Sequence, residues 1–206
     1  MRSVVTCAQF SPARNRERRN DLLTIPGLCG EVHLTANYEK GNWRADRLRF
    51  GRGAWLIQPA FLAVSVYRFG RWTIRAPRLV RPAMHAIYFV AYSVVRLATG
   101  IDIPRGSRFG PGLLIHHFGG IIIHPGSQVG ANCTMRHGVT IGAKEGTGAP
   151  VLGDGVKIGA YAQILGDVTI GHNASIGALT LVLRDVPDGA TAVGIPARIV
   201  SDRPPK

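Results

Sequence analysis

The feature of this chain that most constrains its fold is an apolar residue that returns every six positions after Gly100. Most of these residues are aliphatic, many are followed by glycine, and a small or β-branched residue often stands two positions before them. They form three runs: Ile103, Phe109, Ile115; then Val129, Met135, Ile141; and finally Leu152, Ile158, Ile164, Ile170, Ile176, Val182. A fixed short period of this kind predicts stacked structural repeats.

A period of six fits neither an α-helix nor a simple strand, but it suits a short extended segment followed by a turn. Three such segments close a triangular coil of roughly 18 residues, and stacked coils lie roughly 4.8 Å apart, the spacing between strands. The apolar residues then fill one narrow core that needs a cap at each end. We therefore expect a mostly β solenoid of parallel strands over residues 101–200, preceded by a short helical region and closed by the segment after Val182.

The repeat is interrupted twice. Two additional residues separate Ile115 from Val129, and five additional residues separate Ile141 from Leu152. Because a stacked coil accommodates extra residues only by extruding them, the segment 143–151 is predicted to be a projecting loop. Function is often concentrated in such loops on rigid scaffolds.

The residues before the repeat divide into two parts. Residues 1–40 lack periodicity and are expected to form a basic, loosely ordered arm. Residues 41–100 should be helical, with one helix that starts near Gln58-Pro59 and a second that covers about 83–98 and stops at Gly100. Apolar residues nearly encircle the second helix, which predicts burial between helices or between subunits. Residues 201–206 form a short tail.

The net charge of +13 lies almost entirely in the front half. Residues 1–100 carry 16 basic and 5 acidic side chains, whereas residues 101–206 carry 9 and 7. An anionic cofactor or a phospholipid surface would explain this excess, and so would a solvated basic arm. The sequence contains no recognisable nucleic-acid-binding module. The longest uncharged apolar stretch, 82–95, is too short to span a bilayer, and we expect it to pack on a neighbouring helix rather than lie on a membrane.

Three widely spaced cysteines, Cys7, Cys29 and Cys133, form neither a CxxC metal pair nor an even-numbered disulfide framework. This usage fits a reducing compartment, and the N-terminus has no apolar stretch typical of a secretory signal, so we expect a cytoplasmic protein. Cys133 occupies a small-residue position of the repeat. Its expected role is therefore packing rather than nucleophilic catalysis.

The repeat and several motifs resemble the left-handed β-helix acyltransferases of the hexapeptide-repeat family, and among them the serine O-acetyltransferases. The motifs are YRFGRW (67–72), IDIP (101–104), HHFGG (116–120), GVTIG (138–142) and GIPARIV (194–200). The resemblance covers about residues 60–200. It implies a left-handed coil, acetyl-CoA as co-substrate, no metal, and a homotrimer or a dimer of trimers with active sites between subunits. It also implies transfer of the acetyl group to L-serine, giving O-acetyl-L-serine for cysteine synthesis.

The catalytic pair of this family, an Asp and a His fifteen residues apart, corresponds to Asp102 and His117. An 18-residue coil would stack residue 120 on Asp102, which would place His117 just across a corner from the carboxylate. A serine or sugar hydroxyl is too weak an acid to ionise at neutral pH, so its attack on a thioester needs a base. We expect His117 to be that base and Asp102 to orient its imidazole.

The resemblance also indicates where the substrates bind. His116 stands where the family usually has the Asp that helps to hold serine, and it is the candidate contact for the acceptor. Small residues would line the pantetheine arm of CoA, and two arginines would hold its phosphates; these residues are Gly142, Ala143, Ala160, Ala178, Arg184 and Arg198.

Departures from the family pattern leave the acceptor open. The Arg-His pair that helps to bind substrate in the family's extruded loop is replaced by Gly148 and Ala149. Because relatives that acetylate sugars vary in this way, a sugar hydroxyl in exopolysaccharide or lipopolysaccharide is the alternative acceptor. A scaffold that only binds a partner is a third possibility, which the retained Asp-His pair disfavours.

Two further expectations concern metal and partners. The coil histidines do not fall at the spacing of the metal-dependent carbonic anhydrases that share this coil, and we expect His124 and His137 to be satisfied turn residues. The tail lacks the C-terminal Ile with which some serine acetyltransferases dock onto cysteine synthase, so that complex is not expected.

Overall fold

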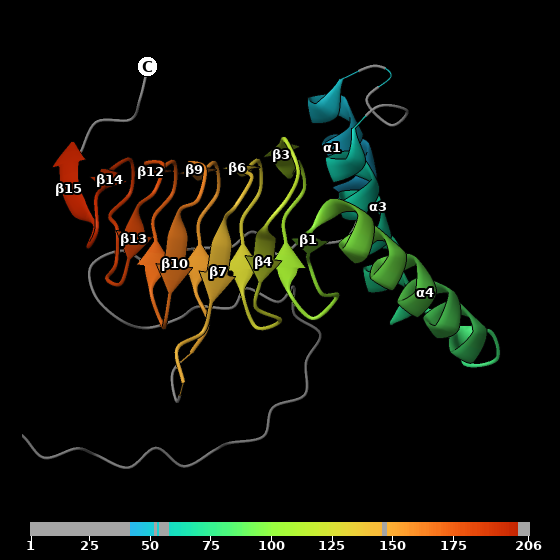
Figure 1. Cartoon of the computed structure of the whole chain (residues 1–206). Helices are drawn as coiled ribbons and strands as arrows, with labels where there is room; N and C mark the ends of the chain where they lie inside the picture. Colours follow the sequence, from blue (N-terminus) through green and yellow to red (C-terminus); the bar gives the residue numbers. More distant parts are fainter. Residues whose placement is uncertain (1–41, 52, 54–57, 146–147, 202–206) are drawn as a thin grey trace, which may run out of the picture.

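The computed structural model describes residues 42–51, 53, 58–145 and 148–201 of the 206-residue chain (Figure 1). The expected basic arm, Cys7, Cys29 and nearly all of the tail lie outside the described residues.

Short strands wind into a three-sided solenoid (Figure 1). The first sheet contains β1 (Ile101–Asp102), β4 (Ile121–Ile123), β7 (Thr140–Gly142), β10 (Gln163–Leu165) and β13 (Leu181–Val182). The second contains β2 (Arg108–Phe109), β5 (Gln128–Val129), β8 (Val151–Leu152) and β11 (Thr169–Ile170). The third contains β3 (Leu114–His116), β6 (Thr134–Arg136), β9 (Lys157–Ile158), β12 (Ser175–Ile176), β14 (Thr191–Val193) and β15 (Arg198–Ser201). The β14–β15 pair is antiparallel and closes the far end, whereas the other paired strands run parallel.

The core of the solenoid is the six-residue repeat. All twelve repeat residues point inward and are at most 3% exposed. The small residues two positions earlier, such as Cys133 and Ala162, are buried as well. Burial of one aliphatic side chain stabilises the fold by about 1.5–3 kcal/mol, so the aliphatic column is the main source of stability. The repeat prediction is therefore confirmed.

The register of the first coil corrects one expectation. Asp102 pairs with Ile122 rather than stacking under residue 120, whereas one coil later Ile122 pairs with Thr140. The first coil is two residues longer than a regular 18-residue coil. The two additional residues lie at the corner between β3 and β4, where His117 begins the connection. His117 therefore protrudes at a widened, solvent-exposed corner.

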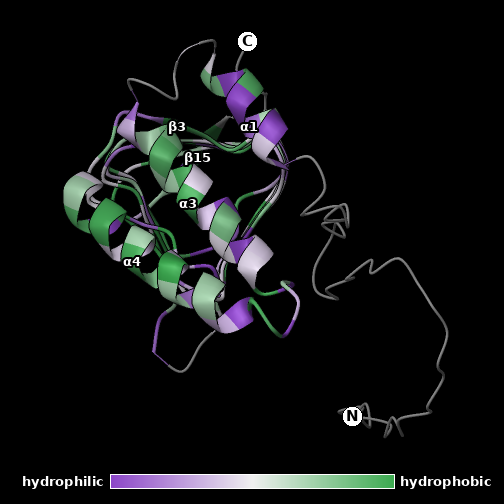
Figure 2. Ribbon diagram, turned by 90° about the vertical axis from the view of Figure 1, so that its right-hand side faces the viewer, coloured by the Kyte–Doolittle hydropathy of each residue, from purple (hydrophilic) through white to green (hydrophobic). Residues whose placement is uncertain are grey.

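Three helices cover the N-terminal end of the solenoid: α1 (Asn42–Phe50), α3 (Pro59–Thr73) and α4 (Arg81–Thr99) (Figures 1 and 2). As predicted, α3 follows an extended Gln58 and begins with a proline. As also predicted, α4 ends at Gly100, whose φ of 65° suits a glycine and whose N–H donates to the carbonyl of Arg96.

A buried ion pair joins the helices to the first coil. The guanidinium of Arg68 in α3 donates to the carboxylate of Asp46 in α1, with an Nε–Oδ2 distance of 2.8 Å. It also donates to the carbonyls of Phe109 and Gly110, each at 2.7 Å. Asp46 accepts a further hydrogen bond from the N–H of Leu113 at 2.8 Å. These contacts fix the helical cap on the coil.

The second predicted helix, α4, is less buried than expected. Of its residues, Tyr88, Val95 and Thr99 are buried, and most of its apolar side chains face solvent. Of the helices that the structure describes, α3 packs on one side of α4, so the expected burial on all sides is not found there. Burial between subunits stays a prediction. Among the described helices, none is long and apolar enough to cross a membrane.

Candidate active site

A column of rings lies at the corner between the third and first sheets. His117 directly follows β3 and has a φ of 66°, which turns the chain sharply out of the strand. Its ring lies edge-to-face with His137 of the next coil, with centroids 5.7 Å apart, and His137 packs in the same way on Tyr161 at 5.0 Å. The His117 side chain is exposed, so its imidazole is accessible to a substrate.

Asp102 is held by α4. Its carboxylate accepts a short hydrogen bond from the hydroxyl of Tyr92 and a 3.4 Å hydrogen bond from the guanidinium of Arg96. Burial and the adjacent carboxylate raise the pKa of Tyr92, which therefore remains a donor at physiological pH. In the described part of the chain no hydrogen bond joins Asp102 to His117. The expected pairing of these residues stays a prediction.

A groove of about 510 Å³ runs over the outer surface of the third sheet and crosses successive coils. Three of the predicted site residues, His116, Ala160 and Ala178, line it. The strand register explains this grouping, because β3, β6, β9 and β12 are neighbours in one sheet.

The groove is cationic. Arg49, Arg136 and Lys157 line it, and none of its lining residues is acidic. Burial and the positive charges of Arg136, His117 and Arg49 lower the pKa of His116 below the usual histidine range. The Oγ of Ser175, also in the lining, is buried and has no hydrogen-bond partner. The arrangement suits an anionic ligand with several oxygen atoms.

Sequence reasoning missed these cations. Arg136 and Lys157 belong to no motif, and they come together only when strands from different coils stack. A usable signal was nevertheless present, since outward-facing positions alternate with the inward repeat positions in β3, β6 and β9. Arg49 lies on α1, which the sequence did not delimit, and its guanidinium donates to Thr134 and to the carbonyl of Cys133.

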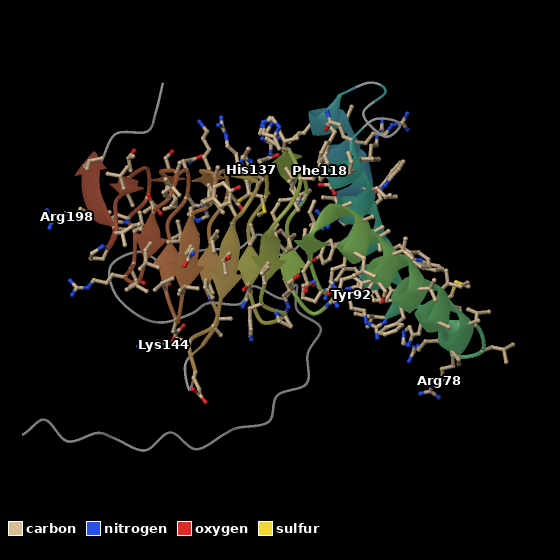
Figure 3. All side chains as sticks on the ribbon, in the orientation of Figure 1. Arg78, Tyr92, Phe118, His137, Lys144 and Arg198 are labelled. Atoms are coloured by element: carbon tan, nitrogen blue, oxygen red, sulfur yellow. The ribbon has the colours of Figure 1, made fainter. Side chains whose placement is uncertain are left out.

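The remaining predicted cofactor residues lie elsewhere. Gly142 ends β7 and Ala143 begins the projecting loop, at a different corner of the coil from the ring column. Arg184 and Arg198 are exposed near the far end of the solenoid, where Figure 3 labels Arg198. None of these four residues lines the groove in a single protomer.

The other histidines differ in their partners. The Nδ1 of His124 accepts the N–H of Gly126 at 3.1 Å, which confirms the expected turn role. His137 differs from expectation, because its buried Nδ1 has no hydrogen-bond partner. Its ring is instead packed between His117 and Tyr161. Among the residues that the structure describes, no three His, Cys, Asp or Glu side chains are grouped so as to hold a metal ion.

Cys133 is fully buried in the coil. Its Sγ lies 3.2 Å from the carbonyl oxygen of Gly153, and burial raises the pKa of its thiol to about 12. A thiol in this environment packs and does not act as a nucleophile, as the repeat position predicts.

Comparison with known proteins agrees with this architecture. Residues 149–184 match the family described as bacterial transferase hexapeptide (six repeats). The coil, its repeat and this match define a hexapeptide-repeat transferase, and the expected left-handed parallel β-helix is confirmed.

Within the hexapeptide-repeat transferases, serine acetyltransferases are among the most similar curated relatives. The serine acetyltransferase of Helicobacter pylori is 36% identical over 154 residues, which are 71% of this chain and 84% of the relative. The chain belongs to the serine acetyltransferase family. The enzyme of Synechococcus elongatus is 38% identical over 162 residues, which are 76% of this chain and 63% of that relative. This chain therefore spans less than two thirds of some of its relatives.

Solved structures give the same result. The crystal structure of Neisseria gonorrhoeae serine acetyltransferase has a TM-score of 0.68 and 32% identity, and the match covers 80% of this chain and 66% of that one. The same enzyme in complex with serine matches with a TM-score of 0.66, 32% identity and coverage of 77% and 67%. A serine acetyltransferase in complex with CoA matches with a TM-score of 0.63, 28% identity and coverage of 80% and 69%.

Proposed function

We propose that this protein is an acetyl-CoA-dependent serine O-acetyltransferase, which converts L-serine and acetyl-CoA to O-acetyl-L-serine and CoA. The observation that carries the proposal is an exposed imidazole, His117, which directly follows a strand that borders a cationic groove across the coils. Relatives with serine and with CoA bound support both substrates.

His117 acts as the general base. Its free imidazole nitrogen takes the proton of the serine hydroxyl while the oxygen attacks the acetyl carbon of the thioester. The resulting tetrahedral intermediate collapses, the C–S bond breaks, and the same imidazole returns the proton to the CoA sulfur. A positioned base of this kind contributes roughly 10²–10⁴-fold to the rate.

Asp102 orients that imidazole and stabilises the imidazolium. Its carboxylate receives hydrogen bonds from Tyr92 and Arg96, and carboxylate oxygens have further lone pairs for a donor on His117. Tyr92 and Arg96 of α4 thus hold the carboxylate in place.

The groove holds CoA. Arg136 and Lys157 face the phosphates, while the small residues Gly159 and Ala160 let the pantetheine arm approach the backbone. A homotrimer of parallel coils accounts for the separate location of Gly142 and Ala143, because the loop corner of one protomer would face the groove of the next. Arg184 and Arg198 remain the alternative phosphate contacts.

The compartment and pathway follow from the chemistry. We place the protein in the cytoplasm, where acetyl-CoA is available, and assign O-acetyl-L-serine to cysteine synthesis. A dimer of trimers would form through the helical caps, and docking onto cysteine synthase is not expected.

A sugar hydroxyl is the second candidate acceptor, and one observation favours it. The ammonium group of serine calls for an anionic partner, but the groove has no acidic lining residue and presents His116 instead. A neutral or anionic glycan in exopolysaccharide or lipopolysaccharide would not need such a partner.

Thiol release from acetyl-CoA, measured with L-serine and with a panel of glycans, tests the acceptor. Turnover with L-serine that cysteine inhibits competitively is expected. Turnover with glycans alone would reject serine and support the second candidate. Light scattering should give three times the 22.1 kDa chain mass, or a multiple of that trimer; a monomer would contradict the shared site.

A pair of variants tests the CoA groove. Arg136→Leu with Lys157→Met should raise the KM for acetyl-CoA about tenfold or more and leave the KM for the acceptor nearly unchanged, because charge-assisted phosphate contacts are lost. Arg184→Leu is the matched comparison. If Arg184→Leu raised the KM for acetyl-CoA strongly and the groove pair had no effect, the CoA phosphates would be assigned to the far end of the coil instead.

A further inference from the structure

The outer face of α4 is apolar and exposed. Ile87, Val90, Val94 and Leu97 recur at spacings of three and four, so they share one side of the helix. Their exposed fractions are 51%, 63%, 58% and 83%, and they lie opposite the buried Tyr88 and Val95. Figure 2 shows α4 as a largely hydrophobic ribbon in front of the solenoid.

The connection between α3 and α4, residues 74–80, adds further exposed apolar side chains to the hairpin. Leu79 is 93% exposed, and Ile74 and Val80 are exposed beside it. Two exposed aromatic side chains flank the same hairpin, Trp72 at the end of α3 and Phe89 on α4. Single exposed apolar residues are ordinary, but this many on one hairpin indicate an interaction surface.

The charged side chains of the α3–α4 hairpin are all positive. Residues 59–101 contain six arginines and no Asp or Glu. Arg68 is neutralised internally by Asp46 of α1, and Arg96 by Asp102 of β1. Arg78 lies in the connection and Arg81 begins α4, and Figure 3 labels Arg78 at the outer tip of the hairpin.

We propose that the α3–α4 hairpin binds the surface of an anionic lipid bilayer. The apolar outer face of α4 and Leu79 enter the boundary between headgroups and acyl chains, while the arginines meet lipid phosphates. The helix lies in the interface and does not span the bilayer, in agreement with the absence of a membrane-spanning helix from the described residues. This inference goes beyond the proposed enzymatic function and does not depend on it.

Charge favours a bilayer over a second copy of the chain. Two hairpins packed face to face would bring arginine clusters together with no hairpin carboxylate to pair them, whereas anionic headgroups neutralise them. Each basic residue near an anionic surface adds to the attraction, which falls off with salt. Sequence reasoning expected this segment to pack on a neighbouring helix, and α3 does pack on one side of α4. The inference concerns the opposite face, which is exposed.

The position of the hairpin suits surface binding. α3 and α4 lie across the N-terminal end of the solenoid, as the view along the coil in Figure 2 shows. In the proposed trimer of parallel coils, three hairpins would face the same direction. Three simultaneous contacts would increase the affinity well beyond that of one hairpin.

Flotation of the full-length protein with lipid vesicles tests the inference. We expect the protein to float with vesicles of phosphatidylcholine and phosphatidylglycerol, not to float with phosphatidylcholine alone, and to bind more weakly in high salt. The V90Q/V94Q variant removes apolar contact, and R78E reverses one charge at the tip. Each should reduce the bound fraction about fivefold or more, since burial and charge both contribute.

The controls are matched in chemistry but lie outside the hairpin. L183Q removes an exposed apolar side chain at the far end of the coil, and R108E reverses an exposed charge on β2; both should bind vesicles like the natural chain. Failure to bind anionic vesicles would overturn the inference. So would equal loss of binding in the control variants, or a change in V90Q/V94Q confined to the oligomeric mass, which would assign the face to a second copy.

Discussion

His116 and His117 are neighbours in the sequence but have different surroundings. His116 ends β3 in register with Arg136 and lines the cationic groove, whereas His117 turns out of the strand and packs edge-on against His137. The same dipeptide therefore provides one histidine whose pKa is lowered by burial and nearby cations, and one that turns out of the strand at a corner. This difference fits a contact role for His116 and a base role for His117.

The pKa of His116 should depend on the positive charges that line the groove. Arg136 disfavours the imidazolium, so Arg136→Leu should raise the pKa of His116 toward the ordinary histidine value. Titration of the His116 ring signals by NMR measures this shift. Lys144→Met, on the projecting loop, is the control and should leave the signal in place. An unchanged or lower His116 pKa in Arg136→Leu would contradict the assigned cause.

Cys133 should be unreactive in the folded protein. With a pKa of about 12, only about one thiol in ten thousand is ionised at pH 8, and the side chain is fully buried. Peptide mapping after iodoacetamide treatment should find Cys133 unmodified in the native protein and modified after unfolding in urea. Rapid native labelling of this residue would show that the coil opens there.

At the scale of elements, the helical cap depends on one buried ion pair. Arg68→Met leaves the carboxylate of Asp46 buried without its cation, and it also removes donors from the carbonyls of Phe109 and Gly110. Loss of one partner of a buried pair costs about 3–5 kcal/mol in the free energy of unfolding. Urea unfolding measures this cost.

A double-mutant cycle separates the pair from its surroundings. Arg68→Met with Asp46→Leu removes both charges, so the double variant should be less destabilised than the sum of the single variants. Strict additivity would mean that the two side chains do not interact, contrary to the 2.8 Å distance between them.

Sequence predicted the elements unevenly, for physical reasons. The coil was predicted from its repeat, because aliphatic residues at every sixth position are buried together when short strands stack into a solenoid. The start of α3 and the end of α4 followed from Pro59 and Gly100. α1 was not delimited because it has no apolar stripe, and it is held instead by tertiary contacts of Asp46 and Arg49.

At the scale of the whole molecule, the stacking of the coils determines which residues share the groove. Local sequence does not show this grouping. The groove joins residues from α1 and from several coils, so its cations are close in space but far apart in the sequence. The corner insertion after β3 moved the register by two residues, and strict repeat counting therefore misplaced the residue above Asp102. Motif matching selected His116 for the acceptor and Ala160 and Ala178 for CoA, and all three line the groove, but it gave no sign of Arg136 or Lys157.

The molecule carries two candidate functional surfaces at different places. The length of the solenoid carries the cationic groove and the ring column, and its N-terminal end carries the basic, apolar hairpin. The variants that test the groove and the base lie on different elements from those that test the hairpin. α4 nevertheless belongs to both regions, because its Tyr92 and Arg96 hold Asp102.

The rate of acetyl transfer from acetyl-CoA to L-serine by His117→Ala tests the central claim most directly. The account predicts a fall of roughly 10²–10⁴-fold, because no other group replaces the base, with the circular dichroism spectrum and oligomeric mass unchanged. A rate close to that of the natural chain would contradict the assignment of His117 as the base.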